Sequence, residues 1–137
     1  MSERPPVELT LVWDGDLRFR GAATDGREVV LDGDARAAIS PVEALGFALA
    51  SCMGADLVHI LRKQRAELRG CEVRFSGRRA QTEPRRYLAV ELSFVLRGAV
   101  EPGHVERALA LSQEKYCSVW HSLRQDVEMT VRYDISK

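Results

Sequence analysis

Two periods of apolar residues alternate along the chain and predict a mixture of strands and helices. Twofold alternation, which is typical of a half-buried strand, runs from Tyr87 to Arg97 and again from Val127 to Ile135. Near the N-terminus, apolar and β-prone residues at 7–13 and 17–21 flank the turn Asp14-Gly15-Asp16, which indicates a hairpin. A short third strand is expected at 28–31.

Helical signals begin at Ser40. This residue and Glu43 have the spacing of a capping box, and Pro41 suits the first helical position. The apolar pattern that follows predicts a long helix that continues to about Leu68 and ends at Gly70, with basic residues in its last turns, where they complement the helix dipole.

The second half of the chain predicts a long hairpin followed by helices and a last strand. Strands at 71–79 and 87–97 are joined by Thr82-Glu83-Pro84-Arg85, a helix is expected at 102–114, and a shorter helical piece at 117–123. This order predicts an α+β fold with antiparallel sheets and with helices gathered on one sheet face. No linker or repeat interrupts it, so residues 1–137 are expected to form a single domain.

The composition of the chain excludes some classes of protein but does not indicate an activity. The chain of 137 residues has 20 basic and 20 acidic side chains and 45% hydrophobic residues, which excludes intrinsic disorder and gives no general electrostatic reason to bind nucleic acid. The apolar stretch 44–61 has the length of a membrane span, but Asp56 and His59 lie inside it, so we interpret it as a buried helix without a membrane partner. The N-terminus lacks the apolar region of a signal peptide, so a cytoplasmic location is expected.

Three cysteines are the candidates for chemistry. The chain has an odd number of cysteines, and none of them forms a CxxC motif. This pattern predicts that Cys52, Cys71 and Cys117 are free thiols. By position alone, Cys52 is most simply a small buried residue in the middle of a helix. Cys117 is expected near a helix start, where free amides would favour its thiolate, and Cys71 has no expected role beyond packing.

Longer motifs surround two of these cysteines. The segments are Ser40-Pro41-Val42-Glu43-Ala44-Leu45, Ala50-Ser51-Cys52-Met53 with the Asp56 to Lys63 segment, and Leu111 to Val119 around Cys117. Together with the strand order, they resemble the OsmC/Ohr family, which is named for osmotically inducible protein C and organic hydroperoxide resistance protein. The resemblance covers most of the chain from about Gly26 onward and implies the OsmC-like fold, with Cys52 on a long central helix.

This resemblance implies a thiol-dependent peroxidase that reduces organic hydroperoxides. Cys52 would be oxidised to a sulfenic acid, Cys117 would capture it as a Cys52–Cys117 disulfide, and an external dithiol of the lipoyl type would reduce that disulfide. No bound cofactor and no metal are expected. The family also implies an intertwined homodimer. The small residues Gly46, Ala50 and Gly54 could accept a second helix, or could equally pack on the chain's own sheet.

The groups that would activate Cys52 depart from the family pattern. In the hydroperoxide reductases a carboxylate follows the proline directly, whereas this chain has Val42 there and the acid at Glu43. At about 100° per residue, Glu43 points away from Cys52 in a straight helix, so its capping role explains it without catalysis.

Other residues remain candidates for activating or orienting the thiol. Asp56 and His59 lie on the Cys52 side of the helix, where they could act on it or form a structural hydrogen-bonded pair. Arg36 and Arg27 are candidates for the family's arginine by approximate position.

Three other functions stay open. The fold could bind a small apolar or electrophilic molecule without peroxidase turnover. A nucleic-acid-binding module is a weaker alternative and rests on the hairpin arginines Arg74, Arg78, Arg79, Arg85 and Arg86, which are more simply a solvated surface. A zinc site would have to combine Cys52 and Cys117 with His59 or His121, a set whose spacing matches no zinc motif.

Overall fold

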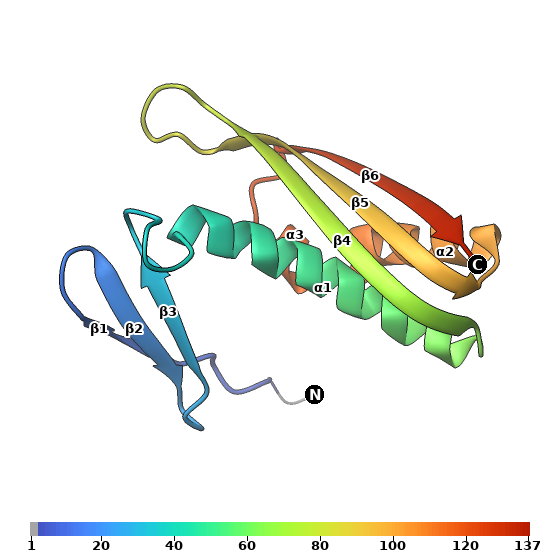
Figure 1. Ribbon diagram of the computed structural model, residues 1–137, viewed down its shortest axis with the longest axis horizontal. Coiled ribbons are helices and arrows are strands. Elements are labelled where there is room, and N and C mark those ends of the chain that lie inside the picture. The colour runs from blue at the N-terminus through green and yellow to red at the C-terminus, as the bar shows by residue number, and fades with distance from the viewer. Residues whose placement is uncertain (1–2) are drawn as a thin grey trace. The chain divides into compact units, whose positions relative to one another are not determined.

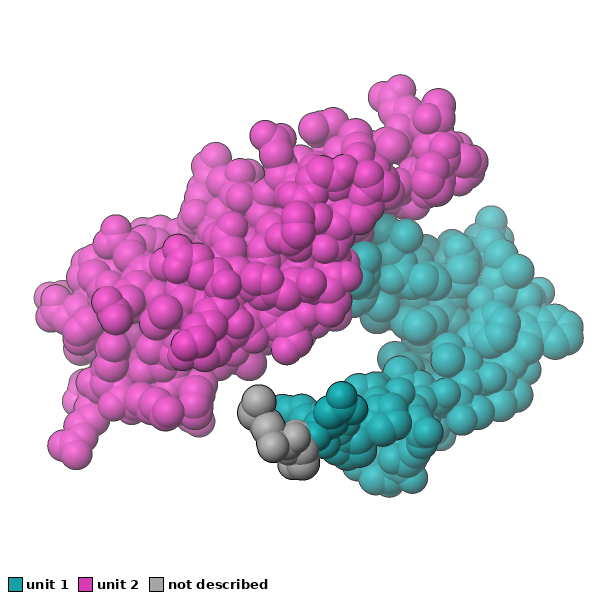
Figure 2. All heavy atoms as spheres, turned by 180° about the vertical axis from the view of Figure 1, so that it is seen from behind, with its two compact units in different colours: residues 1–45 teal, residues 46–137 magenta. Residues whose placement is uncertain are grey.

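A computed structural model describes residues 3–137, which form two compact units within Met1–Leu45 and Gly46–Lys137 (Figure 2). The first unit contains one three-stranded sheet, and the second contains another together with most of the helical residues (Figure 1). The predicted α+β class is confirmed.

The first sheet is an antiparallel meander of β1 (Leu9–Trp13), β2 (Arg18–Ala23) and β3 (Glu28–Asp32). The predicted hairpin is present. Its turn requires a positive φ of 89° at Gly15, and the indole N–H of Trp13 donates to the Asp16 carbonyl over 2.8 Å.

One face of this sheet is apolar and exposed. The strand register places on that face five large side chains that are each between 41% and 65% exposed: Leu9, Leu11, Trp13, Phe19 and Val29. We call this set the β1–β3 apolar face. A contiguous exposed surface of this kind is unusual on a monomer and is typical of an interaction surface.

Helix α1 (Pro41–Lys63) begins as predicted. The Ser40 backbone N–H donates to the Glu43 carboxylate over 2.9 Å, and the Glu43 N–H donates to Ser40 Oγ over 3.2 Å, so the capping box is formed. By length and composition the helix could cross a membrane, a property that core helices of soluble proteins share, and seven of its residues are buried.

The end of α1 corrects the sequence prediction, because the helix stops before Leu68 and Gly70. The Ala66 N–H donates to the Leu61 carbonyl, the Arg65 N–H donates to the Arg62 carbonyl, and Arg65 has a φ of 58°. These bonds form a Schellman motif with arginine where glycine is usual. Leu68 and Gly70 therefore belong to the next strand.

The second sheet has the order β4 (Glu67–Arg79), β5 (Tyr87–Ala99) and β6 (Glu128–Ser136). The β4–β5 pair is the predicted antiparallel hairpin, but β5 and β6 are parallel, so the expectation of a wholly antiparallel sheet is wrong for this pair. Parallel pairing is possible because a helical connection carries the chain back to the starting edge.

That connection consists of α2 (Pro102–Leu111), a π-helical turn η1 (Ser112–Tyr116) and the short helix α3 (Ser118–His121). The predicted helix at 102–114 therefore changes its hydrogen-bonding pattern at Ser112, and the predicted piece at 117–123 is shorter. π-Helical turns are rare in proteins as a whole, but those that occur often lie at functional sites.

The core lies where α1 and α2 cover one face of the second sheet (Figure 1). Strand β5 supplies Val90, Leu92, Phe94 and Leu96, and α1 supplies Leu49, Met53, Leu57 and Leu61, all at most 4% exposed. The opposite sheet face is polar and carries the Arg132–Glu91 ion pair. This arrangement explains the alternation read from the sequence.

The small residues of α1 face strand β4 of their own chain. A Cβ added at Gly46 would lie 2.8 Å from the Phe75 ring, and one at Gly54 would lie 3.3 Å from Val73. Of the two uses that the sequence left open for these glycines, the structure therefore shows packing on the chain's own sheet.

Candidate functional site

Cys52 lies on α1 and is half-buried. It follows the exposed Ser51 and precedes the fully buried Met53, so it stands at the edge between the buried and the exposed sides of the helix. Cys52 therefore lies at the boundary of the hydrophobic core and stays partly exposed.

Cys117 is fully buried at the junction of η1 and α3. Its N–H donates to the Ser112 carbonyl over 2.8 Å, and its Sγ accepts the Trp120 N–H over 3.3 Å. The predicted position at a helix start is confirmed, because Cys117 is the N-cap of α3. The helix start does not favour the thiolate here, because burial outweighs the amide hydrogen bonds.

The two thiols meet. The pKa of Cys117 is raised from 9.0 to about 11, mainly by burial and also by a hydrogen bond with the Cys52 side chain and by the Cys52 charge, against the lowering effect of the Trp120 amide. A hydrogen bond that raises a thiol pKa favours the protonated thiol. Cys117 is therefore held as a thiol beside the Cys52 side chain.

Asp56 contacts the segment that carries Cys117. Its carboxylate accepts a 2.7 Å hydrogen bond from Ser112 Oγ, and Ser112 is fully buried. Since the Ser112 carbonyl also accepts the Cys117 N–H, this bond joins α1 to the start of the π-helical turn that positions Cys117.

His59 is separate from that contact. It is exposed on α1, and within residues 3–137 no hydrogen bond or ion pair joins it to Asp56. The structural Asp56–His59 pair considered from the sequence is therefore not formed.

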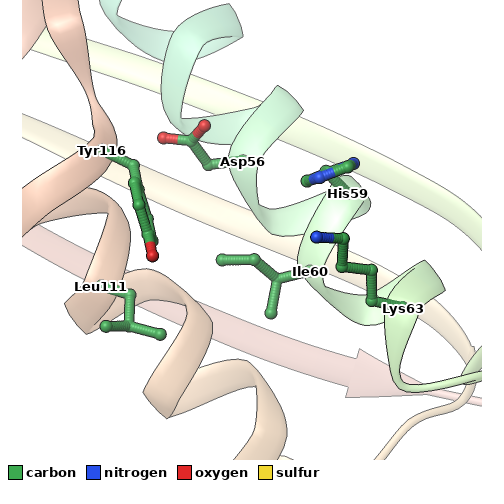
Figure 3. Close-up of a pocket in the computed structure, with 6 residues that line it drawn as sticks. All are labelled: Asp56, His59, Ile60, Lys63, Leu111 and Tyr116. Atoms are coloured by element: carbon green, nitrogen blue, oxygen red, sulfur yellow. The ribbon is translucent and has the colours of Figure 1, made fainter. Parts of the chain in front are cut away.

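A pocket of about 410 Å³ opens beside this contact. Figure 3 shows its six lining side chains, which come from α1, the end of α2 and η1: Asp56, His59, Ile60, Lys63, Leu111 and Tyr116. Ile60 and Leu111 are apolar, whereas the other four carry polar or charged groups.

Glu43 and Arg36 lie in the first unit. The Ser40 hydrogen bonds that occupy the Glu43 carboxylate also lower its pKa, which agrees with a capping role. Arg36 is exposed on the loop after β3, where the buried Asp32 accepts the backbone N–H groups of residues 34, 36 and 37. Arg27 forms an ion pair with Asp25 over 2.8 Å.

The remaining candidates have ordinary surroundings. Cys71 is exposed on the edge strand β4. Around the β4–β5 turn, Arg79 donates to the Arg85 carbonyl over 2.8 Å, and Arg85 pairs with Glu83 over 3.3 Å. Among residues 3–137, no three His, Cys, Asp or Glu side chains converge as metal ligands.

Sequence reasoning missed three residues of this region. The sequence analysis assigned no role to Ser112, Lys63 or Tyr116. The available signal was a polar residue on the apolar stripe Val105, Ala108 and Leu109. A buried hydroxyl needs a partner, and Asp56 is that partner.

Comparisons with known proteins bear on the family and the fold. The family described as OsmC-like protein matches residues 32–132. Protein YhfA from Escherichia coli K12 is 34% identical over 131 residues, covering 94% of this chain and 98% of its own length.

Among solved structures, a hypothetical protein from Aquifex aeolicus VF5 is 28% identical, covers 97% of this chain and 98% of its own, and has a TM-score of 0.89. An organic hydroperoxide resistance protein OsmC from Legionella pneumophila has the same fold, with a TM-score of 0.70 at 16% identity over 97% of this chain and 99% of its own.

Proposed function

The chain belongs to the OsmC-like protein family, and from this premise we propose that it is a thiol-dependent peroxidase that reduces organic hydroperoxides. Cys52 is the residue that attacks the peroxide, and Cys117 is the residue that resolves the oxidised product. The observation that carries the proposal is the hydrogen bond between the two thiols.

The first step consumes the hydroperoxide. The Cys52 thiolate attacks the terminal oxygen, so an S–O bond forms, the O–O bond breaks and, after protonation, the alcohol leaves. Cys52 is thereby oxidised to a sulfenic acid by two electrons. Its half-buried position leaves it the more accessible of the two thiols, which supports this assignment.

The second step removes the sulfenic acid. The Cys117 sulfur, after losing its proton, attacks the Cys52 sulfur, an S–S bond forms and water leaves. An external dithiol of the lipoyl type then returns two electrons and two protons. The contact between the thiols supports this step, because a resolving thiol must be within reach of the sulfenic acid.

Activation of Cys52 in this chain differs from that of the hydroperoxide reductases. Glu43 is occupied by the capping box, and Val42 replaces the family carboxylate. We assign the resolving step to the Cys117 contact, because a thiol beside Cys52 is within reach of its sulfenic acid. Asp56 is then a positioning residue that acts through Ser112, and Arg36 remains a candidate for a supporting cation.

We further propose that the working form is a homodimer. The β1–β3 apolar face is exposed, and so is Phe47 on α1, at 62%. A second copy of this chain would bury both, as the family resemblance implies. Three unpaired cysteines also fit a reducing compartment, so we place the protein in the cytoplasm.

The test is the consumption of cumene hydroperoxide and hydrogen peroxide with dihydrolipoamide as reductant. We expect Cys52→Ser to abolish turnover and Cys117→Ser to stop it after one equivalent while leaving a sulfenic acid that dimedone traps. Cys71→Ser is the matched control, because this exposed thiol lies outside the site and should not change the rate. Full activity in Cys52→Ser would overturn the proposal.

A further inference from the structure

The pocket beside the Asp56–Ser112 contact has a polarised lining. In Figure 3, the Lys63 ammonium and the His59 ring lie on one side, and Tyr116 and Leu111 lie on the opposite side with Ile60 between them. The carboxylate of Asp56 turns away from the Lys63 ammonium. One end of the pocket therefore carries the Lys63 ammonium and the His59 ring, whereas Leu111, the Tyr116 ring and the Asp56 carboxylate lie toward the other.

The cationic end has side-chain donors to spare. His59 and Lys63 are exposed, and within residues 3–137 the side chain of neither forms an ion pair or a hydrogen bond. The Asp56 carboxylate, the acidic group of the lining, already accepts the Ser112 hydroxyl. An anion at this end would meet N–H donors from two side chains one helical turn apart.

The apolar end can hold a short hydrocarbon or aromatic body. Ile60 and Leu111 are half-buried, and the Tyr116 ring is 49% exposed, with the Lys115 ammonium 5.4 Å from its centroid. This cation–π contact helps to fix the ring that forms the wall. A volume of about 410 Å³ lies in the range of small-molecule pockets.

We propose that this pocket binds a small amphipathic monocarboxylate, with its carboxylate at Lys63 and His59 and its apolar body on Ile60, Leu111 and Tyr116. A single negative charge is favoured because Lys63 is the one permanent cation of the lining. The dianion of a phosphate monoester would need more donors. This site is additional to the proposed redox function and does not depend on it.

The test uses the reduced full-length protein without peroxide, so that thiol oxidation plays no part. Octanoate is titrated by calorimetry and by NMR chemical-shift mapping, next to octanol, which lacks the charge, octyl phosphate, which is a dianion, and acetate, which lacks the chain. We expect octanoate to bind at least about ten-fold more tightly than the other three and to shift resonances of Ile60, Leu111 and Tyr116.

Lys63→Gln should weaken octanoate binding about ten-fold or more and leave octanol binding unchanged. The matched control is Arg62→Gln, which removes the same charge from the neighbouring exposed residue of α1 outside the lining. Equal binding of octanoate and octanol, tighter binding of octyl phosphate, equal effects of the two substitutions, or shifts confined to another surface would each overturn the proposal.

Discussion

At the scale of single residues, Cys52 and Cys117 carry the same thiol in different surroundings. Cys117 is fully buried and Cys52 is half-buried, and the two side chains are hydrogen-bond partners. Burial therefore holds the proton on Cys117, the thiol that we propose to resolve the sulfenic acid.

This difference predicts how stability depends on pH. The raised pKa of Cys117 means that the unfolded thiol ionises first, so its contribution is fully present below pH 9 and is lost as the pH rises to about 11. Urea unfolding of the reduced wild type and of Cys117→Ser should show a stability difference that falls over this range by about 1.4 kcal/mol per pKa unit. A difference that stays constant from pH 8 to pH 11 would contradict it.

The sequence identified both cysteines through their motifs, but not their hydrogen bond. That contact depends on the π-helical turn before Cys117, and no residue pattern in 112–116 indicates such a turn. Glu43 shows the opposite case, because its capping role follows from spacing alone and was predicted correctly. Local spacing specifies local bonds, whereas contacts between distant segments need the fold.

At the scale of elements, the bond between Asp56 and Ser112 joins α1 to η1. Ser112→Ala would leave a half-buried carboxylate without its donor, which costs about 1–3 kcal/mol of folding free energy. Asp56→Asn should cost less, because its amide oxygen still accepts. If the bond positions Cys117, Ser112→Ala should also lengthen the lifetime of the Cys52 sulfenic acid, measured by dimedone trapping after one equivalent of peroxide, and Asp56→Asn should lengthen it less.

His59→Gln is the control for this prediction, since His59 lies on the same helix without the Ser112 contact. It should leave the sulfenic acid lifetime unchanged. Normal disulfide closure in both Ser112→Ala and Asp56→Asn would show that the bond serves stability alone.

The packing of α1 on β4 gives a second prediction at this scale. Gly46→Ala would place a Cβ 2.8 Å from the Phe75 ring, and this overpacking should lower the free energy of unfolding by about 1–3 kcal/mol. Gly103→Ala is the matched control. Nothing lies within 4 Å of its new Cβ in α2, so the same change should be neutral or stabilising.

Chemical denaturation of the two variants decides the point. Phe75→Leu combined with Gly46→Ala should recover part of the loss, because a smaller side chain makes room for the new methyl group. Equal stability of Gly46→Ala and the wild type would mean that the helix and strand separate at little cost.

Element boundaries were predictable where a local motif marks them. The start of α1 is marked by Ser40 and Glu43, and the structure agrees. Its end is set by Arg65 in a left-handed conformation, which arginine seldom adopts, and Gly70 was the more obvious signal. The parallel β5–β6 pair was missed because alternation in a strand does not reveal the direction of its neighbour.

At the scale of the whole molecule, the two units differ in how well they bury their apolar residues. The unit from Gly46 to Lys137 contains the hydrophobic core, whereas the first unit leaves the β1–β3 apolar face exposed. A sheet that leaves its apolar face in water lacks the burial that would stabilise it. This contrast is the physical reason for proposing a second copy of the chain as its cover.

The proposed homodimer is tested by the mass of the particle in light scattering. The wild type should have about twice the chain mass of 15.3 kDa. Leu11→Glu, which places a charge on the β1–β3 apolar face, should shift the protein toward the monomer. Thr10→Glu adds the same charge one position along β1, on the opposite face, and should remain dimeric. A monomeric wild type would exclude this arrangement.

Gly46 and Gly54 mark the side of α1 that packs on β4, and the rest of the helix surface faces away from that strand. One side is already used by the chain's own sheet, and the exposed side, with Phe47, Ser51 and Ala55, is what a second chain can cover. Cys52 lies at the seam between these sides. In the proposed homodimer, access to the thiol would be governed by assembly as well as by folding, so protein concentration itself would control its reactivity.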